Sequence, residues 1–569
     1  MRSRLFRFWL LVALPLGLFS KEAIIPLAEV KPGMQGIWKT VVSGREIREY
    51  RLEVVDIMYG LMAPGVPTIF CKALDEDQIH IGTVAGMSGS PVYIEGKLAG
   101  AYALGFPFPK DQALIGVTPI ENMLGILDFD EDTSSSVSSK PHAYLGAQGP
   151  QACMPLFMPG VPEKTIHYLN ASLPQLGFRA VSAAGSSAPS ADKEAPSVDH
   201  IAGGSAIAPV LLGGDFLWGG VGTVTTREGD TLLAFGHPFF DAGPVDVPFA
   251  EADIITIVQN YASSFKLPKI GKVIGSLTQD KLTGVLGKLG RKPNTIACTF
   301  NLSYPDGSKK TYQGDLCRFW GLSPLIFGGA LHSVLTESLG AQMKQTFFMH
   351  TRFEFDDKPT IDLEDVGSGE EGVQWLAEIT ERRYGRLMEN PFEAAPLKSV
   401  TFDIKVQNGW FDQKLYSVEL LGDRTEPGDT LKVAIETMRF RDTRNRHLIE
   451  IPLPKNIPLE SLSVYVGDAT HTNFIDRGRG NKDFQSLDDI LEYFTKHRST
   501  GAIYVKLLSK DPGLVVGGCG LSGLPSSMLH LLQGGNAWND IQSIPFTTLW
   551  ETSIPIEGVF TGEHQLPVK

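Results

Sequence analysis

Short apolar runs between glycine- and proline-rich turns dominate the first half of the chain. Residues 51–57 alternate apolar and polar side chains, which is the pattern of a strand buried on one face. Residues 92–101 predict a hairpin that closes at Glu95-Gly96. Further strands are predicted at 206–212, 220–226 and 231–235. The pattern therefore indicates a mainly β protein with short, tightly connected strands.

The second half of the chain has a different pattern of apolar and polar residues. A polar segment with a predicted helix at 372–388 precedes alternating strands at 400–406, 415–421 and 430–440. Turns rich in Pro, Gly and Asp separate these strands, and this spacing predicts a C-terminal β-sandwich. Residues 128–150 are acidic and serine-rich, which is typical of a solvated linker.

One turn in the first β unit carries candidate chemistry. A predicted strand at 83–85 runs into Gly86-Met87-Ser88-Gly89-Ser90-Pro91. Glycines on both sides of Ser88 allow backbone angles that can aim a pair of amides at a developing oxyanion. This hexapeptide has the Gly-x-Ser-Gly-(Gly/Ser)-Pro form of the nucleophile turn in trypsin-like serine peptidases. The alternative is a Gly/Ser-rich turn without chemistry, so a base is needed to decide between them.

His237 is the candidate base. It ends the apolar run Leu232-Leu233-Ala234-Phe235-Gly236, and Pro238 follows it. A histidine fixed between a glycine and a proline at the end of a strand is held by the backbone, which suits a general base. The alternative is a structural histidine at a strand end.

Together these two motifs resemble the SpoIVB-type sporulation serine peptidases. That family has a Gly-Met-Ser-Gly-Ser-Pro turn, here 86–91, and an Ala-Leu-Gly-His segment after a Val-Gly-Thr strand, here 234–237 after 221–223. The resemblance implies a trypsin-like double β-barrel peptidase core. It also implies that Ser88 is the nucleophile, that His237 is the general base, and that the amides of Gly86 and Ser88 form the oxyanion hole.

The chain departs from the family in two respects. Ser88 precedes His237, whereas the histidine half comes first in the family, so the half-barrels are expected in permuted order. A triad depends on geometry and not on chain order, so this order is acceptable. The acidic member is less defined. Asp75 is the nearest match to the family's aspartate, and the competing carboxylates are Asp77, Asp241 and Asp246.

These signals divide the chain into segments. They are a signal peptide or N-terminal anchor at 1–20, a serine half-barrel at 22–127, an acidic linker at 128–150, a histidine half-barrel with a helical insert at 151–355, a linker with a helix at 356–396, a β-sandwich at 397–510, and a C-terminal segment at 511–569 that packs back on an earlier domain.

Composition narrows the class of partner. The 51 basic and 64 acidic residues give a net charge of −13, which argues against a nucleic-acid partner. Five scattered cysteines with no Cys-x-x-Cys motif predict neither a metal site nor a disulfide, and no cofactor is expected. Basic residues at 2, 4 and 7 before an apolar stretch at 8–19 predict an export signal, so the membrane is expected to be contacted only through a possible N-terminal anchor.

The sequence therefore predicts an exported serine endopeptidase that cleaves a protein or peptide substrate in the cell envelope, or cleaves itself. The alternative is a catalytically inactive, peptidase-like envelope protein that serves binding or assembly. The expected location is periplasmic or otherwise extracytoplasmic.

Overall fold

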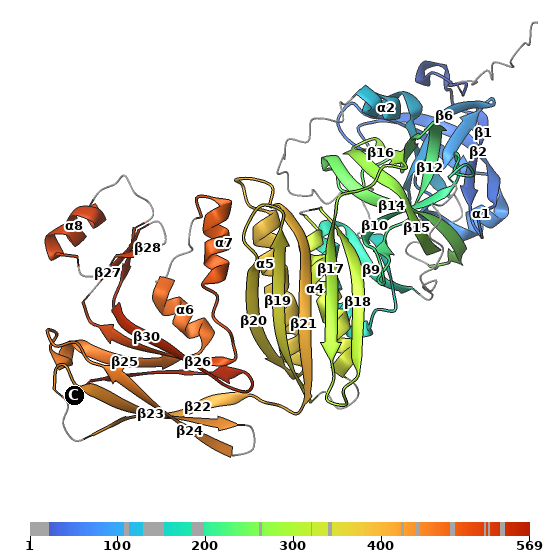
Figure 1. Ribbon diagram of the computed structural model, residues 1–569. Helices are drawn as coiled ribbons and strands as arrows, with labels where there is room; N and C mark the ends of the chain where they lie inside the picture. Colours follow the sequence, from blue (N-terminus) through green and yellow to red (C-terminus); the bar gives the residue numbers. More distant parts are fainter. Residues whose placement is uncertain are drawn as a thin grey trace, which may run out of the picture.

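The computed structural model describes residues 22–106, 113–128, 153–183, 198–260, 264–319, 321–339, 344–422, 426–439, 443–477, 484–511, 513–516, 519–521, 524–534 and 541–568. The predicted signal at 1–20 and nearly all of the predicted linker at 128–150 lie outside these residues. The chain is mainly β, as predicted, and its parts follow one another along an extended molecule (Figure 1). No helix in the described segments is long and apolar enough to cross a membrane.

The first part is a closed six-stranded barrel. Its strands follow the order β1 (Gln35–Val41), β2 (Ile47–Tyr59), β3 (Pro67–Ala73), β7 (Leu114–Pro119), β6 (Lys97–Gly105) and β5 (Pro91–Ile94), with β5 returning to β1. Trp38, Leu52 and Val117 are among the side chains that fill its interior. The predicted hairpin at Glu95-Gly96 is confirmed, and so is the helix at 120–124, which is α2 (Ile120–Leu124).

Six later strands form a second closed ring. They are β10 (Ala206–Leu212), β12 (Gly222–Glu228), β13 (Thr231–Ala234), β16 (Gly284–Leu289), β15 (Ser264–Lys281) and β14 (Gly243–Val258). Pairing of Ala206 in β10 with Thr223 in β12 closes this ring. The short strand β4 (Val84–Ala85) leaves the first barrel and pairs in parallel with β15. The two barrels therefore share a joint at the segment that leads into Ser88.

A mixed layer continues from the second barrel. Strand β10 pairs with β18 (Lys309–Cys317), and the sheet goes on through β17 (Thr295–Ser303), β21 (Leu397–Asn408), β19 (Gln345–Phe355) and β20 (Ile361–Ser368). Helices α4 (Ser323–Leu339) and α5 (Gly369–Met388) pack together behind this sheet, and α3 (Glu163–Asn170) packs on α4 (Figure 1). Strands β8 (Met154–Pro159), β9 (Phe178–Ala183) and β11 (Trp218–Gly219) attach at its β10 side.

This layer differs from the domain division that the sequence predicted. Strand β21 was expected to open the C-terminal sandwich, but it lies inside the middle sheet, where the ring of Phe402 stacks on Phe300 at 5.0 Å. The helix expected within a linker at 356–396 is α5, whose apolar side packs against the sheet through Val373 and Leu376. The sequence pattern identified both elements but could not assign their partners, because each buried face fits any apolar surface.

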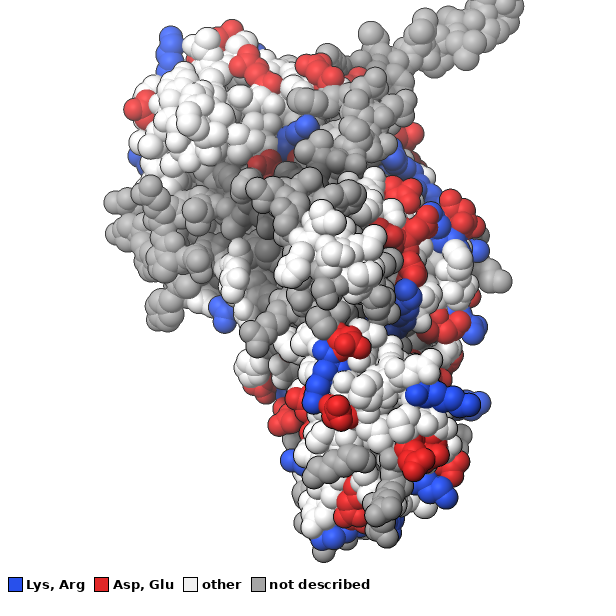
Figure 2. Space-filling view, turned by 90° about the vertical axis from the view of Figure 1, so that its left-hand side faces the viewer, with Lys and Arg blue, Asp and Glu red and all other residues white. Residues whose placement is uncertain are grey.

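Two four-stranded sheets form the C-terminal part and share one hydrophobic core. The first has the order β24 (Thr443–Pro452), β23 (Thr430–Arg439), β22 (Gln413–Leu421) and β31 (Phe560–Thr561), and the second has β30 (Thr547–Pro555), β26 (Ala502–Ser509), β25 (Leu462–Gly467) and β32 (Glu563–Pro567). Helix α6 (Ala469–Arg477) packs on β25 and β26, whereas α7 (Leu487–Thr495) packs on β20 and α5 of the middle layer. The remaining elements of this part are α8 (Ser526–Gly534) and a small sheet of β28 (Cys519–Leu521), β27 (Gly513–Val516) and β29 (Ile541–Ile544). On the face shown in Figure 2, the described basic and acidic side chains are interspersed.

A buried ion pair joins the middle layer to the segment after α7. Asp365 in β20 is fully buried, and Arg383 in α5 donates to it at 2.5 Å. His497 reaches the same carboxylate at 2.9 Å. Burial alone would raise the pKa of Asp365, but the charge of Arg383 and the hydrogen bond of His497 lower it to about 2. The carboxylate therefore depends on its partners to remain buried as an anion.

We expect Arg383→Met to destabilise the protein by about 3–5 kcal/mol, because it leaves the Asp365 carboxylate buried without its main counter-charge. The matched control is Arg382→Met, since Arg382 is the neighbouring residue of α5 and is exposed, and its effect should stay within about 0.5 kcal/mol. Urea unfolding of both variants measures the difference. Equal stability of the two variants would contradict this account of Asp365.

Candidate functional site

The turn that carries Ser88 lies at the joint between the barrels. Strand β4 ends at Ala85 and β5 begins at Pro91, so 86–90 connects the parallel pairing with β15 to the first barrel. The side chain of Ser88 is half-buried, whereas Gly86, Gly89 and Ser90 are buried. The turn thus presents Ser88 from a fixed support.

Hydrogen bonds inside the turn leave two amides available. The amide and the hydroxyl of Ser90 both donate to the carbonyl of Met87, at 2.9 Å and 2.6 Å, and the amide of Gly89 donates to Tyr102 at 2.7 Å. Within the described segments, the N–H groups of Gly86 and Ser88 have no hydrogen-bond partner. These are the two amides that the sequence predicted for the oxyanion hole. Two free N–H groups on a fixed turn can donate to an incoming carbonyl oxygen.

The second barrel holds the carbonyl side of the same turn. The amide of Thr223 donates to the carbonyl of Ser88 at 2.8 Å, and its hydroxyl donates to that of Gly86 at 2.8 Å. The hydroxyl of Thr225 donates to the carbonyl of Gly89 at 2.7 Å. Alternate residues of a strand face the same side, so the Thr-x-Thr spacing in β12 brings both hydroxyls to the turn. Carbonyls held on one side direct the free amides away from β12.

Gly89 is required by this close approach. Its φ is +96°, and a Cβ atom there would lie 1.9 Å from the carbonyl oxygen of Thr223 and 2.4 Å from the amide nitrogen of Phe235. The contact with Phe235 also shows that the segment leading to His237 passes directly beside the serine turn.

His237 is brought to the same place through strand β6. It follows β13 after two residues with positive φ, Phe235 at +69° and Gly236 at +68°. Gly236 packs on Ala101 and Ala103 of β6, and its carbonyl accepts the hydroxyl of Thr118 at 2.6 Å. Because β6 is also the strand that binds Gly89 through Tyr102, both turns rest on one strand. The left-handed conformation of Phe235 costs conformational energy because its side chain is bulky, and such backbone strain is typical of a functional site.

The imidazole of His237 is buried and oriented by the backbone. Its Nδ1 lies 2.7 Å from the carbonyl oxygen of Pro238. A carbonyl can only accept, so this contact assigns the proton to Nδ1 and leaves the lone pair on Nε2. Burial lowers the pKa of His237, so the ring is neutral at pH 7. A neutral imidazole that carries its proton on Nδ1 is the form that can accept a proton at Nε2.

Asp280 at the end of β15 anchors the segment after His237. Its carboxylate accepts the amides of Phe239 at 2.8 Å and Phe240 at 2.5 Å. Burial raises the pKa of Asp280 to about 7, although these amides act in the opposite direction. Sequence analysis did not identify Asp280, because its position in an alternating strand carries no signal of what it binds.

Three of the four carboxylates considered as the acidic member have other partners. Asp75 accepts the backbone amide of Arg51 at 2.5 Å and pairs with its guanidinium at 2.8 Å. Asp77 accepts the amide of Gln78 at 2.9 Å, and Asp246 accepts the hydroxyl of Ser276 and the amide of Asn294. Asp241 lies in the loop that Asp280 holds, with φ +56°. The role of Asp75 stays a prediction, and the Pro238 carbonyl is the group seen at Nδ1 of His237.

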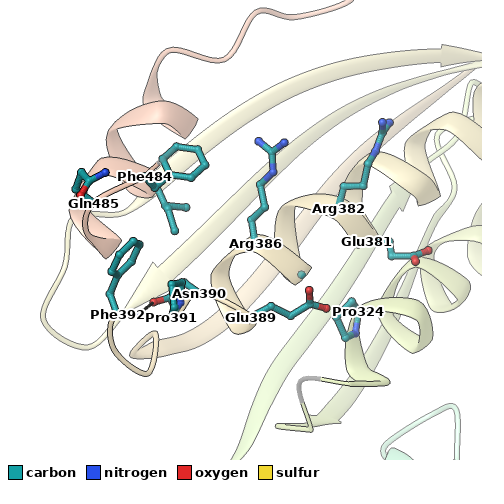
Figure 3. A pocket seen from close by; sticks show the side chains of 12 residues that line it. Pro324, Glu381, Arg382, Arg386, Glu389, Asn390, Pro391, Phe392, Phe484 and Gln485 are labelled. Carbon is teal, nitrogen blue, oxygen red and sulfur yellow. Dashed lines mark hydrogen bonds between the residues drawn. The ribbon is translucent and has the colours of Figure 1, made fainter. Parts of the chain in front are cut away.

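A cavity of about 850 Å³ lies elsewhere, beside α5 in the middle layer. Arg382 and Arg386 of α5 and Glu389, which directly follows this helix, face it, with Phe392 and Phe484 on the opposite side (Figure 3). Its lining contains none of the residues of the two turns. No group of three His, Cys, Asp or Glu side chains in the described residues is arranged to hold a metal ion.

Comparison with known proteins adds no assignment to this geometry. No protein-family model, no curated protein and no solved structure matches the chain. The function must therefore be argued from the site itself.

We expect Gly89→Ala to destabilise the protein by about 3 kcal/mol or more, because the new Cβ meets backbone atoms and the φ is positive. The control is Gly96→Ala, at φ +76° with nothing within 4 Å, which should cost only about 1–2 kcal/mol. Differential scanning calorimetry compares the two variants. A Gly89→Ala variant as stable as Gly96→Ala would show that the turn is not tightly packed against Thr223.

Proposed function

We propose that the chain is a serine peptidase with a trypsin-like double-barrel core in permuted order. The observation that carries this proposal is that the Ser88 turn and the His237 turn, which are distant in sequence, both dock on β6 and both contact Thr223 or its neighbours. A barrel that only binds has no need of a half-exposed serine, a neutral buried histidine and two free amides in one place. The resemblance to the SpoIVB-type peptidases points to the same chemistry.

In the proposed reaction, Nε2 of His237 takes the proton of the Ser88 hydroxyl as its oxygen attacks a peptide carbonyl. The amides of Gly86 and Ser88 donate to the oxyanion of the tetrahedral intermediate. His237 then gives its proton to the leaving amine, and water releases the acyl group by the same route. The carbonyl of Pro238 keeps the Nδ1 proton in place, which is the task that a carboxylate performs in a Ser-His-Asp triad.

The substrate class follows from the same proposal. The chain would act on a protein or peptide of the cell envelope after export, or on itself in cis. The C-terminal pair of sheets, taken as a β-sandwich, would be a binding module for the substrate or for another envelope component.

A second candidate function is binding without catalysis. The observation that favours it is the cavity beside α5, which combines two arginines with aromatic side chains far from Ser88 in sequence. In this alternative the barrels would be a scaffold and the cavity would hold the ligand.

We expect a fluorophosphonate probe to label the purified protein at Ser88. Ser88→Ala should abolish labelling, and His237→Ala should slow it by about 10²-fold or more, because the base is lost. His200→Ala is the histidine control, since His200 is exposed and pairs with Glu251. Asp75→Asn should retain labelling if the Pro238 carbonyl suffices to orient His237. Absence of labelling in the folded wild-type protein would favour the binding alternative.

The pH dependence of labelling tests the state of His237. Because burial lowers the pKa of His237 below its ordinary value of 6.5, the neutral base persists in more acidic solution than for an exposed histidine. The labelling rate should therefore fall with decreasing pH only below 6.5. Second-order rate constants measured across pH give this acid limb. A midpoint above 6.5 would mean that the imidazole is charged more readily than its burial implies.

A further inference from the structure

Lys266 occupies an unusual place beside the serine turn. It directly follows Ser264 and Phe265, the two residues of β15 that pair with Val84 and Ala85. The side chain has no exposed surface, and its stem lies against Gly86, where a Cβ atom would be 3.2 Å from Lys266 Cβ and 3.3 Å from its Cδ. The lysine is thus packed against the first residue of the turn.

The amine of Lys266 reaches both barrels. Its Nζ lies 2.8 Å from the hydroxyl of Thr40 in β1 and 3.1 Å from that of Thr223 in β12. The Thr223 hydroxyl in turn donates to the carbonyl of Gly86 at 2.8 Å. A chain of hydrogen bonds therefore leads from the amine to the backbone of the serine turn.

Among the residues that the structure describes, no charged group compensates this amine. Another buried lysine, Lys506, pairs with Asp476 and Glu551, whereas burial is the only cause of the lowered pKa of Lys266. The charged residues on the strands around Lys266 have other partners or are exposed. Lys39 of β1 pairs with Glu49, and Glu251 and Asp253 of β14 pair with Arg45. Arg227 of β12 donates to backbone carbonyls, while Lys269 of β15 and Glu228 of β12 are exposed.

We propose that Lys266 is a positioning residue, whose ammonium group fixes the Thr223 hydroxyl on the Gly86 carbonyl and so holds the oxyanion-hole amides in place. An ammonium group has only N–H donors, so each hydroxyl that it contacts must accept from it and donate elsewhere. For Thr223 the available acceptor is Gly86. A neutral amine has a lone pair and can accept the Thr223 proton instead, which releases the Gly86 carbonyl. The inference rests on the proposed peptidase function.

A pH effect follows from this arrangement. Burial lowers the pKa of Lys266 to about 7. At a pH below this pKa the ammonium is present and holds the serine turn. As the pH rises through the pKa, the ammonium is lost. His237 must be neutral, which sets an acid limit below 6.5. The labelling rate of Ser88 should therefore pass through a maximum as the pH rises. Its decline on the alkaline side should come from loss of the Lys266 ammonium and not from titration of His237.

The test compares Lys266→Met with Lys269→Met, which makes the same change at an exposed position of the same strand. We expect Lys266→Met to label about 10- to 100-fold more slowly at about pH 6 and to lose the alkaline decline, because a displaced turn no longer presents its amides. Lys269→Met should behave as the wild type does. A Lys266→Met variant that keeps both the wild-type rate and the alkaline decline would overturn the inference while leaving the peptidase proposal intact.

A second readout does not depend on catalysis. In the wild type, hydrogen exchange of the amides in 84–90 should accelerate above pH 7 by more than the intrinsic increase of the exchange rate with pH. This additional acceleration should be absent in Lys266→Met. No labelling in the wild type together with this exchange behaviour would refute the peptidase proposal but retain the coupling of Lys266 to the turn. Exchange that is insensitive to Lys266 would refute the coupling itself.

Variants of Thr223 cover the case in which Lys266→Met does not fold. Thr223→Val removes the hydroxyl that links the amine to Gly86, and it should slow labelling as Lys266→Met does. Thr223→Ser keeps the hydroxyl and should restore the wild-type rate and pH profile. Equal labelling by the valine and serine variants would overturn the inference.

Discussion

The bonds from Thr223 to the serine turn are the contacts on which the rest of the candidate site depends. One residue of β12 binds the carbonyl of Ser88 with its amide and that of Gly86 with its hydroxyl, and it also closes the second barrel through β10. Backbone groups that enter a buried joint must be paired, so the two barrels can meet here only with the turn in one conformation. The position of Ser88 is therefore a property of the joint as well as of the turn.

The same joint explains why the order of Ser88 and His237 along the chain has little effect on how their turns are placed. Ser88 lies in a segment of the first barrel and His237 in a segment of the second, and both turns contact β6. Closed barrels fix their own strands independently of how they are linked, and the geometry of the pair is then set by the contacts between them. The segment between the barrels could be long or short without changing this arrangement.

Much of the local structure could be predicted from the sequence. Alternation predicts many of the strands, a polar segment predicts the helix α5, and the glycines around Ser88 predict a turn, in which Gly89 cannot carry a side chain. What could not be predicted are contacts between distant segments. Asp280 and Lys266 both lie in β15 and act on turns elsewhere in the chain, and β21 joins a sheet whose other strands precede it. Periodicity reports which side of an element is buried but not against what.

Strand β15 runs from Lys266 beside the serine turn to Asp280 beside the segment after His237. The Ser88 turn and the segment after His237 are therefore braced by a single continuous element, although they come from different barrels. Local opening of a protein occurs in contiguous units, and a unit that contains β15 would release both turns together. The site would then have two populations, fully assembled or fully dispersed.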